Sequence, residues 1–409
     1  MYAREIYGLI MVGMMLLMTG CSADEVVMET TSGDAVAISF TCDYDDKEEN
    51  TTRAGYEGVM NTEDLQTTGF GAMASLSAGG APTYDNKPNL MYNQEVEFTL
   101  VGDLENPKKG YWSYQPVKYW PSDLEHCYIS AYAPYVEPAD LVGLDETKTG
   151  IIGMSENSEA PYIAYRRCET PASNVDLLWY YKDFAPTDKI PEATAAQPAG
   201  TLNMKMRHAL ARLEIQVALA TDVVLDAGTK VLIEKITLTG NMAKTGRLHL
   251  YEQETETVVV NEEEVTKYYP VWSDQTYDDH TFQITNLDND DGSYGIIDNQ
   301  IRYIEGLPYS WQPAGLKVYN PSAPEGTDDG MRNALSTGDR TGYVYLIPQD
   351  VQNLTVKVKY HKMTAEGDET GVRTTTESTL RIPKPTLEKP NPKLRGNATY
   401  TLKLKLSSI

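Results

Sequence analysis

Two residues near the start of this 409-residue chain are of a type, and in a context, that predict covalent processing. Cys21 follows a Met-Thr-Gly tripeptide. Small residues before a cysteine leave the scissile bond accessible to a lipoprotein signal peptidase, and the thiol can then carry diacylglycerol. Arg53 ends an acidic stretch and precedes Ala54, so it offers an accessible site to an arginine-specific protease. We therefore expect lipidation at Cys21 and cleavage between Arg53 and Ala54.

The segment before Cys21 has the features of a secretory signal peptide. Residues 6–18 form an apolar run behind Arg4 and Glu5. The run is too short to cross a bilayer as a permanent helix, which indicates a cleaved signal over residues 1–20. Each acyl CH₂ that enters a membrane contributes about 0.8 kcal/mol, so two or three chains on Cys21 would anchor the protein almost irreversibly. The alternative is an ordinary secreted protein whose Cys21 is incidental.

An isolated hydrophobic strand is expected between the two processing sites, over Ala35 to Thr41. Its alternation places Val36, Ile38 and Phe40 on one face. Burial of these three side chains would stabilise the precursor by very roughly 5 to 9 kcal/mol before chain entropy is subtracted. Residues 42–53 are rich in Asp and Glu, and we expect them to be exposed and mobile.

Cleavage after Arg53 would detach this strand together with any lipid on Cys21. It would leave a hydrophobic groove in which backbone donors and acceptors are unpaired. Such an edge invites a strand from another chain. The residues themselves thus predict a removable strand and a partner strand that replaces it.

Composition bounds the class of protein. The length without residues 1–20 suffices for two or three domains, and 41% hydrophobic with 23% charged residues predicts a folded chain. A formal net charge of −24 argues against a nucleic-acid partner, because phosphates would be repelled. With Cys21 acylated, three cysteines remain, at positions 42, 127 and 168. An odd number allows one bridge but no disulfide framework.

Period-two alternation dominates the chain, and we expect an all-β fold, because no amphipathic helix of ten or more residues is evident beyond the signal. Three prolines between Asp183 and Gly200 interrupt the apolar pattern, which favours two β-rich domains on either side of about residue 195. Strands are expected at 69–74, 95–100, 127–133, 176–180, 202–208, 211–219, 231–238, 247–251, 257–260, 343–347, 354–360, 378–382 and 399–406.

Three segments resemble recurring segments of fimbrillin-like pilus subunits from anaerobic Gram-negative bacteria. They are residues 61–74, residues 119–121 with 128–135, and residues 206–215. The resemblance extends from the cysteine motif to the final strand. It implies two transthyretin-like β-sandwich domains in tandem, an outer-membrane lipoprotein precursor and, after removal of the first strand by an arginine-specific protease, a cell-surface fimbrium built with other pilus subunits by strand exchange.

Combined with the processing sites, the resemblance implies a division of the chain into four parts. These are a signal peptide over residues 1–20, a removable leader over 21–53, an N-terminal sandwich over 54–190 that the strand at 35–41 completes, and a C-terminal sandwich over 191–409. Arg53 and the strand Ala35 to Thr41 match the family's cleavage position and removed strand.

The last strand bears on which kind of subunit this is. Tyr400, Leu402, Leu404 and Leu406 alternate with polar residues, as in a half-buried strand. If this strand completes its own sandwich, the chain can receive a donor strand but has none to give, which suits the tip of a fibre. The alternative is a shaft subunit, in which residues 400–406 swing out as a donor and residues 378–382 close the domain.

Other chemical readings are weaker. We expect Tyr119, Trp120, Tyr128 and Tyr132 to pack in the core or close its corners, and His208 to be a hydrogen-bonded core histidine. Asn286, Asp288 and Asp290 have some calcium-loop spacing but lack its glycine and glutamate, so a solvated turn is expected. The acidic run 262–264 is expected at an exposed hairpin. No cofactor, metal or catalytic motif is evident, and we expect no enzyme.

Two readings of other classes stay open. One is a lipid-retained anchor or glycan-binding surface lipoprotein, in which some of the 28 tyrosines and five tryptophans stack on sugars. The other is a secreted hydrolase whose acids converge only in space. The choice among tip, shaft and anchor, the host or bacterial surface ligand, and the pairing of the three cysteines also stay open.

Overall fold

A computed structural model gives the fold. The chain divides into two units, Met1–Val36 and Ala37–Ile409. The described residues are 36–44, 60, 62–77, 88–101, 110–121, 126–170, 173, 175–185, 187–219, 224–226, 229–260, 263–283, 294–297, 317–319, 331–333, 344–351, 354–363, 369–379 and 393–406. Cys21, Arg53, Ala54 and the segment 286–290 lie outside them.

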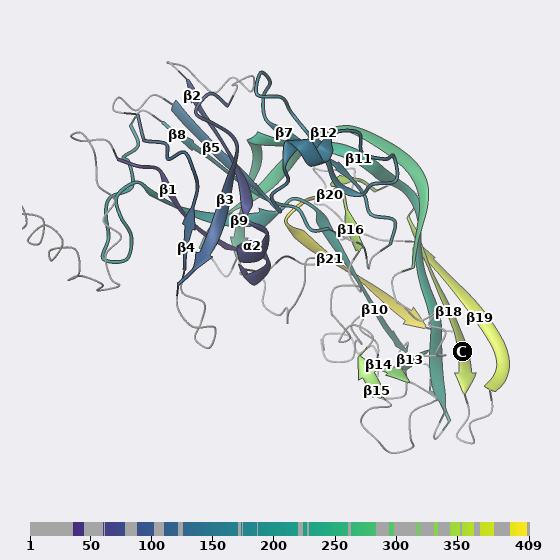
Figure 1. Cartoon of the computed structure of the whole chain (residues 1–409). Coiled ribbons are helices and arrows are strands. Elements are labelled where there is room, and N and C mark those ends of the chain that lie inside the picture. Colours follow the sequence, from purple (N-terminus) through teal and green to yellow (C-terminus); the bar gives the residue numbers. More distant parts are fainter. Residues whose placement is uncertain are drawn as a thin grey trace, which may run out of the picture. The chain divides into compact units, whose positions relative to one another are not determined.

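A seven-stranded sheet has the order β1-β9-β8-β5-β2-β3-β4 (Figure 1). Its neighbours are antiparallel except β1 and β9, which are parallel. The strands are β1 (Ser39–Tyr44), β2 (Phe70–Ser77), β3 (Met91–Leu100), β4 (Gly110–Ser113), β5 (His126–Ala133), β8 (Leu178–Phe184) and β9 (Thr201–His208).

A nine-stranded sheet follows the path β15-β14-β13-β11-β18-β19, with β12 and β7 paired to β11 and β6 paired to β7. Its strands are β6 (Gly150–Met154), β7 (Tyr162–Arg166), β11 (Lys230–Val260), β12 (Glu263–Gln283), β13 (Tyr294–Ile297), β14 (Lys317–Tyr319), β15 (Met331–Asn333), β18 (Thr355–Met363) and β19 (Glu369–Thr379). Because β7 precedes residue 190 and β11 follows it, both halves of the chain contribute to this sheet.

Two smaller sheets complete the strands. One has the order β16-β10-β21, from Val344–Leu346, Ala211–Leu219 and Ala398–Leu406, and the other pairs β17 (Gln349–Asp350) with β20 (Lys393–Leu394). Helices are short: α2 (Thr62–Thr68), with two acidic residues in its first turn, and the 3₁₀ turn η1 (Pro138–Leu141). Within the described part of the chain, neither is long and apolar enough to span a membrane.

A buried core lies between the two large sheets. Met73, Tyr128 and Trp179 contribute from β2, β5 and β8, and they pack with Ile163 of β7 and Leu248 of β11. Two sheets that bury a shared apolar layer form a sandwich. The all-β class expected from the sequence is therefore confirmed.

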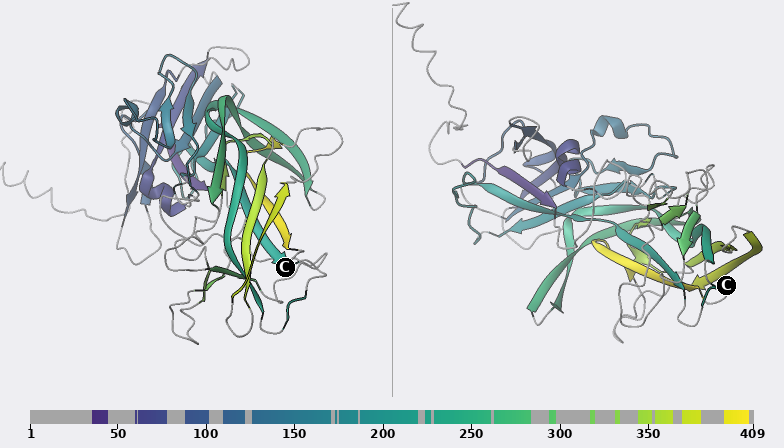
Figure 2. Two further views of the ribbon diagram at one scale, coloured as in Figure 1. Left: turned by 90° about the vertical axis from the view of Figure 1, so that its right-hand side faces the viewer. Right: turned by 90° about the horizontal axis from the view of Figure 1, so that it is seen from below.

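The distal ends of β11 and β12 form a two-stranded ribbon that pairs only with itself among the described strands. Its register runs from Gln253 opposite Pro270 to Val260 opposite Glu263. Both views of Figure 2 show this hairpin end extending away from the neighbouring strands. Glu263 and Glu264 are exposed there, at the hairpin that the acidic run predicted.

The strand expected over Ala35 to Thr41 needs correction in its bounds. Ala37 makes only an isolated bridge, and the continuous strand β1 runs over Ser39–Tyr44. The strand extends further because β9 offers partners as far as Met206. Cys42, which was expected at the start of an exposed stretch, is 3% exposed and continues the buried face of β1.

Two further expectations were wrong. Tyr119 does not pack in the core: it is 48% exposed, because it alternates with the buried Trp120 at the edge of the sheet. The strands expected separately at 231–238, 247–251 and 257–260 are one strand, β11, because β12 pairs with it across the residues between them, with some register shifts. The three cysteines at positions 42, 127 and 168 are all buried, and none of them forms a disulfide bond.

The strands β9 and β10 are consecutive, joined at Ala209 and Leu210, and each carries a parallel edge strand. β1 lies parallel to β9 and β21 lies parallel to β10. The leader strand and the last strand thus hold equivalent places in their sheets. The division of the chain at residues 190 and 191 stays a prediction, and β9, which follows that point, belongs to the seven-stranded sheet.

Candidate functional site at the leader strand

The leader strand, here residues 37–44, lies at one edge of the seven-stranded sheet and also contacts the segment that follows β4. On one side it pairs with β9 in six consecutive positions, from Ser39 opposite Thr201 to Tyr44 opposite Met206. On the other side Ile38 donates its backbone N–H to the carbonyl oxygen of Lys118 over 2.8 Å, just beyond β4. Because the leader bonds both to β9 and to the segment after β4, its removal would expose backbone groups on both.

The apolar face of the leader strand is buried. Ile38 is 1% exposed and Phe40 3% exposed. The ring of Phe40 lies edge to face with Phe70 at 5.8 Å and tilted against Tyr114 at 5.5 Å, both between ring centroids. Burial of Ile38 and Phe40 contributes about 3 to 6 kcal/mol at the usual value per side chain. These two side chains fill a space that would otherwise be an apolar groove.

Tyr114 ties the leader strand to the sheet edge. Its hydroxyl donates to the carbonyl oxygen of Ile38 over 2.8 Å and accepts from the backbone N–H of Lys118 over 3.2 Å. Burial raises the pKa of Tyr114 to about 12, because the phenolate would be desolvated. The hydroxyl therefore stays protonated, and able to donate, at neutral pH.

Gly200 lies at the start of the groove wall and needs its glycine. Its φ is +81°, a left-handed conformation that side chains with a Cβ adopt at a cost. Its carbonyl oxygen accepts two bonds, from the backbone N–H of Ser39 over 3.2 Å and from Nε1 of Trp120 over 3.0 Å. One carbonyl oxygen at this turn therefore binds both the leader strand and Trp120 of the segment after β4.

The polar face of the leader strand forms a side-chain ladder with β9. Oγ of Ser39 lies 2.8 Å from Oγ1 of Thr201. The hydroxyl of Thr41 donates to Oδ1 of Asn203, which also accepts from Nε2 of Gln197 over 2.9 Å. Opposed polar side chains of this kind add to the stability of a strand pair and help to fix its register.

The chain that follows the leader is anchored next to the sheet. The carboxylate oxygen Oδ2 of Asp176 accepts from the backbone N–H of Met60 over 3.0 Å and lies 2.7 Å from Nδ1 of His208. Asp176 is 1% exposed, and the side chain of His208 is 14% exposed. His208 is thus a mostly buried, paired histidine, as expected. The chain on the C-terminal side of Arg53 has its own attachment, independent of the leader strand.

The predicted site residues divide by location. The side chains of Ile38 and Phe40 are both buried in the groove between β9 and the segment after β4, whereas Val36 is half-buried and belongs to the first unit. In the terminal strand Tyr400 is half-buried, and its hydroxyl accepts from the backbone N–H of Arg395 over 2.9 Å. Leu402, Leu404 and Leu406 lie opposite Ile215, Val217 and Leu219 in the register of β10.

Sequence reasoning missed the residues that line the groove around the leader strand. Tyr114, Gly200, Thr201, Asn203 and Lys205 were not singled out, although the alternation of β9 placed its polar residues on one face. That pattern identifies a two-faced strand but not the strand that pairs with it. Among the described residues, no three acidic, histidine or cysteine side chains cluster in a way that could hold a metal ion.

These features define a class: an all-β protein whose leader strand lies at a sheet edge and is buried on its apolar face. The family model described as fimbrillin-like matches residues 52–311, more than half of the chain. The chain belongs to the fimbrillin-like family, a family of fimbrial structural and cell adhesion proteins. The resemblance seen in the sequence is thereby confirmed.

Comparison with solved structures gives matches of low identity. A fimbrial protein from Bacteroides vulgatus is 17% identical with a TM-score of 0.48, over 91% of this chain and 96% of that chain. A presumed cell adhesion protein from Bacteroides uniformis is 12% identical with a TM-score of 0.38, over 91% and 94%. The fimbrial anchor protein Mfa2 from Porphyromonas gingivalis is 8% identical with a TM-score of 0.24, over 64% and 78%. No curated protein matches the sequence.

Proposed function

We propose that this chain is a fimbrial subunit whose leader strand is a temporary plug. In the precursor, residues 37–44 occupy the groove between β9 and the segment after β4. Proteolysis between Arg53 and Ala54 frees the plug, and a strand from another pilus subunit takes its place. The role is structural, and the chain carries out no catalysis of its own.

One observation carries the proposal. The leader strand lies at a sheet edge, and its link to the following chain passes through residues 45–59, so a single cut separates it from the sheet covalently. Among the described residues, those that line the groove around the leader all come later in the chain, including Phe70, Tyr114 and Thr201. The walls would therefore stay in the folded chain after the plug leaves, with unpaired backbone groups and an apolar lining ready for a replacement.

Localisation follows from the same scheme. Acylation at Cys21 holds the precursor in the outer membrane, and removal of residues 21–53 releases it from the lipid into the surface fimbrium. The self-filled groove keeps subunits from polymerising before the protease acts. Placement at the tip of the fibre, and adhesion to a host or bacterial surface ligand there, are part of the proposal.

An Arg53→Ala variant tests the scheme. We expect it to fold with the thermal stability of the unchanged precursor, to keep its lipid and to stay out of fimbriae. Mass spectrometry of the first residue reports the state directly: Ala54 is expected in the assembled form. Fimbriae that contain a chain still starting at acylated Cys21 would contradict the proposal and favour the lipid-retained anchor. An Arg166→Lys variant serves as the control, because Arg166 lies within β7 and outside the proposed cut.

A further inference from the structure

We propose that the polar edge of β9 selects the replacing strand by its chemistry: hydrogen-bond donors opposite Thr201 and Asn203, and a carboxylate opposite Lys205. This inference rests on the proposed strand exchange and names the partner that the groove fits. The partner is a strand of another subunit, with large apolar residues at the positions of Ile38 and Phe40 and this polar sequence between and after them.

The first two positions require donors because both β9 atoms act as acceptors. The hydroxyl of Thr201 donates its only proton to the carbonyl oxygen of Pro198 over 2.7 Å. Its oxygen can therefore only accept from Ser39, whose Oγ lies 2.8 Å away. The amide oxygen Oδ1 of Asn203 can only accept as well, and it does so from Thr41. A strand without donors at these two positions leaves both oxygens without that partner.

The third position requires a negative charge. Lys205 is exposed on β9, and Asp43 is its partner in the register of the leader strand. Opposite charges directly across a strand pair are favourable, and like charges are unfavourable. The leader thus has a hydroxyl donor at Ser39 and at Thr41 and an acidic residue at Asp43. Their register partners on β9 are Thr201, Asn203 and Lys205.

The chain's own last strand does not fit this order in a parallel arrangement. If Tyr400 takes the place of Ile38, the polar positions become Thr401, Lys403 and Lys405. The first two can donate, but Lys405 falls opposite Lys205, where two positive charges meet. A shift by two residues toward the C-terminus of β9 places Lys403 opposite Lys205 instead. A shift by two residues in the other direction places Ser407 there, which removes the like charge but supplies no carboxylate. The groove therefore favours a strand from a different subunit over β21 of a second copy.

Peptide exchange on the nicked full chain tests this inference. The full-length, unacylated chain is cut between Arg53 and Ala54, and the bound leader fragment is displaced by added peptides, followed by mass spectrometry. The probes have the sequence of residues 37–44, that sequence with Asp43→Lys, the sequence of residues 400–406, and that sequence with Lys405→Asp. We expect the carboxylate-bearing member of each pair to bind roughly three- to tenfold more tightly.

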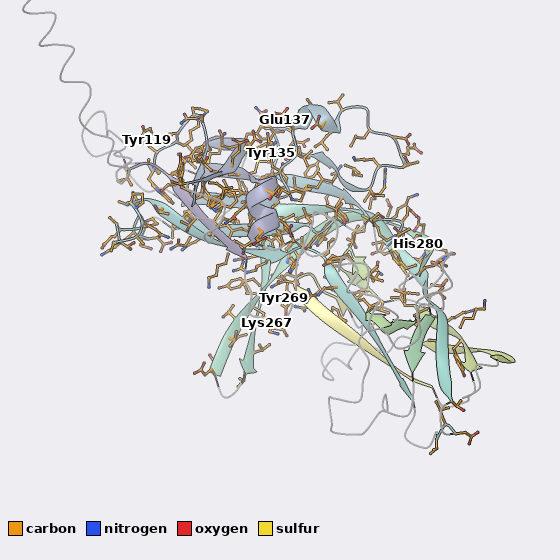
Figure 3. All side chains as sticks on the ribbon, turned by 60° about the horizontal axis from the view of Figure 1, so that its bottom comes forward. Tyr119, Tyr135, Glu137, Lys267, Tyr269 and His280 are labelled. Atoms are coloured by element: carbon orange, nitrogen blue, oxygen red, sulfur yellow. The ribbon has the colours of Figure 1, made fainter. Side chains whose placement is uncertain are left out.

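Charge reversal on the protein provides the matched test. With Lys205→Glu, the preference within each pair should invert. With Lys267→Glu it should not change, because Lys267 is exposed on the β11–β12 ribbon, away from Tyr119 in the segment after β4 (Figure 3). Peptide binding that does not depend on the charge at position 205, or a terminal-strand peptide that binds as tightly as the leader peptide, would overturn the inference while leaving strand exchange intact. Absence of exchange with every peptide would overturn the proposed function, and this inference with it.

Discussion

The hydroxyl of Tyr114 donates a hydrogen bond of 2.8 Å to the carbonyl oxygen of Ile38 and so links the segment after β4 to the leader strand. Tyr114 is 9% exposed and also touches the ring of Phe40. One residue thus contacts both the backbone and the buried face of the leader. It belongs to the groove wall and would remain when the leader leaves, so it is suited to hold either the leader or its replacement.

The buried face of the leader should carry most of its binding energy. Phe40→Ala removes a ring that lies against Phe70 and Tyr114, and we expect a loss of about 3 to 5 kcal/mol in the free energy of unfolding of the precursor. Val142→Ala is the control: Val142 is 81% exposed, and a change within about 0.5 kcal/mol is expected. Denaturant unfolding measures both. Equal stability of Phe40→Ala and the unchanged chain would place Phe40 outside the core.

The nicked chain should lose its leader more readily at alkaline pH, because Tyr114 ionises there. Burial raises the pKa of Tyr114 to about 12, above the value of about 10 for an exposed tyrosine. Because the folded-state pKa is the higher one, the contribution of Tyr114 is fully present below about pH 10 and is lost as the pH rises toward 12. Leader retention by the nicked chain, measured from pH 8 to 12, should fall over that range.

The Tyr114→Phe variant isolates this contribution from other buried tyrosines. It should retain the leader less well at pH 8, by about 1 kcal/mol, because the carbonyl oxygen of Ile38 loses its donor. Between pH 10 and 12 its retention should fall less steeply than that of the unchanged chain. Parallel pH profiles for the two proteins would show that the Tyr114 hydroxyl does not hold the leader.

A glycine behind the groove wall should tolerate no side chain. A Cβ at Gly71 would lie 2.7 Å from Oδ1 of Asn93 and equally close to Cζ of Tyr132, two groups that are hydrogen-bonded to each other over 2.6 Å. We expect Gly71→Ala to destabilise the chain by about 2 kcal/mol or more. Gly153→Ala, whose new Cβ would make only an ordinary 3.4 Å contact with Ala164, should change stability little. Thermal unfolding of both variants compares them, and equal melting temperatures would contradict the packing described.

The sequence was most informative where apolar alternation is strong. The strands around Cys127 and Ala211 were predicted within one residue of their bounds, since each presents an unbroken apolar face. The buried positions of Ile38 and Phe40 were predicted for the same reason. Short strands with glycine, such as β6 (Gly150–Met154), and polar ones, such as β12 (Glu263–Gln283), were missed. They lack a regular apolar alternation, and it is their pairing with β7 and β11 that makes them strands.

The walls of the groove were beyond sequence reasoning for a related reason. Tyr114 and Thr201 are 87 positions apart in the sequence, and each contacts the leader strand, Tyr114 at Ile38 and Thr201 at Ser39. Alternation predicts which residues of a strand are polar, but the direction of the Thr201 hydrogen bond depends on the nearby carbonyl of Pro198. Only the fold brings such an acceptor opposite Ser39.

A reversible disulfide between the leader and β9 would show whether the leader has to leave its groove before the chain can join a fimbrium. Ser39 and Thr201 are register partners whose side-chain oxygens lie 2.8 Å apart, so the double variant Ser39→Cys, Thr201→Cys can form a disulfide between the leader and β9. Ser39→Cys alone is the control. After cleavage at Arg53, we expect the oxidised double variant to keep its leader and stay out of fimbriae, and we expect reduction to restore incorporation. Incorporation of the oxidised, cross-linked chain at the level of the single variant would contradict the proposed strand exchange.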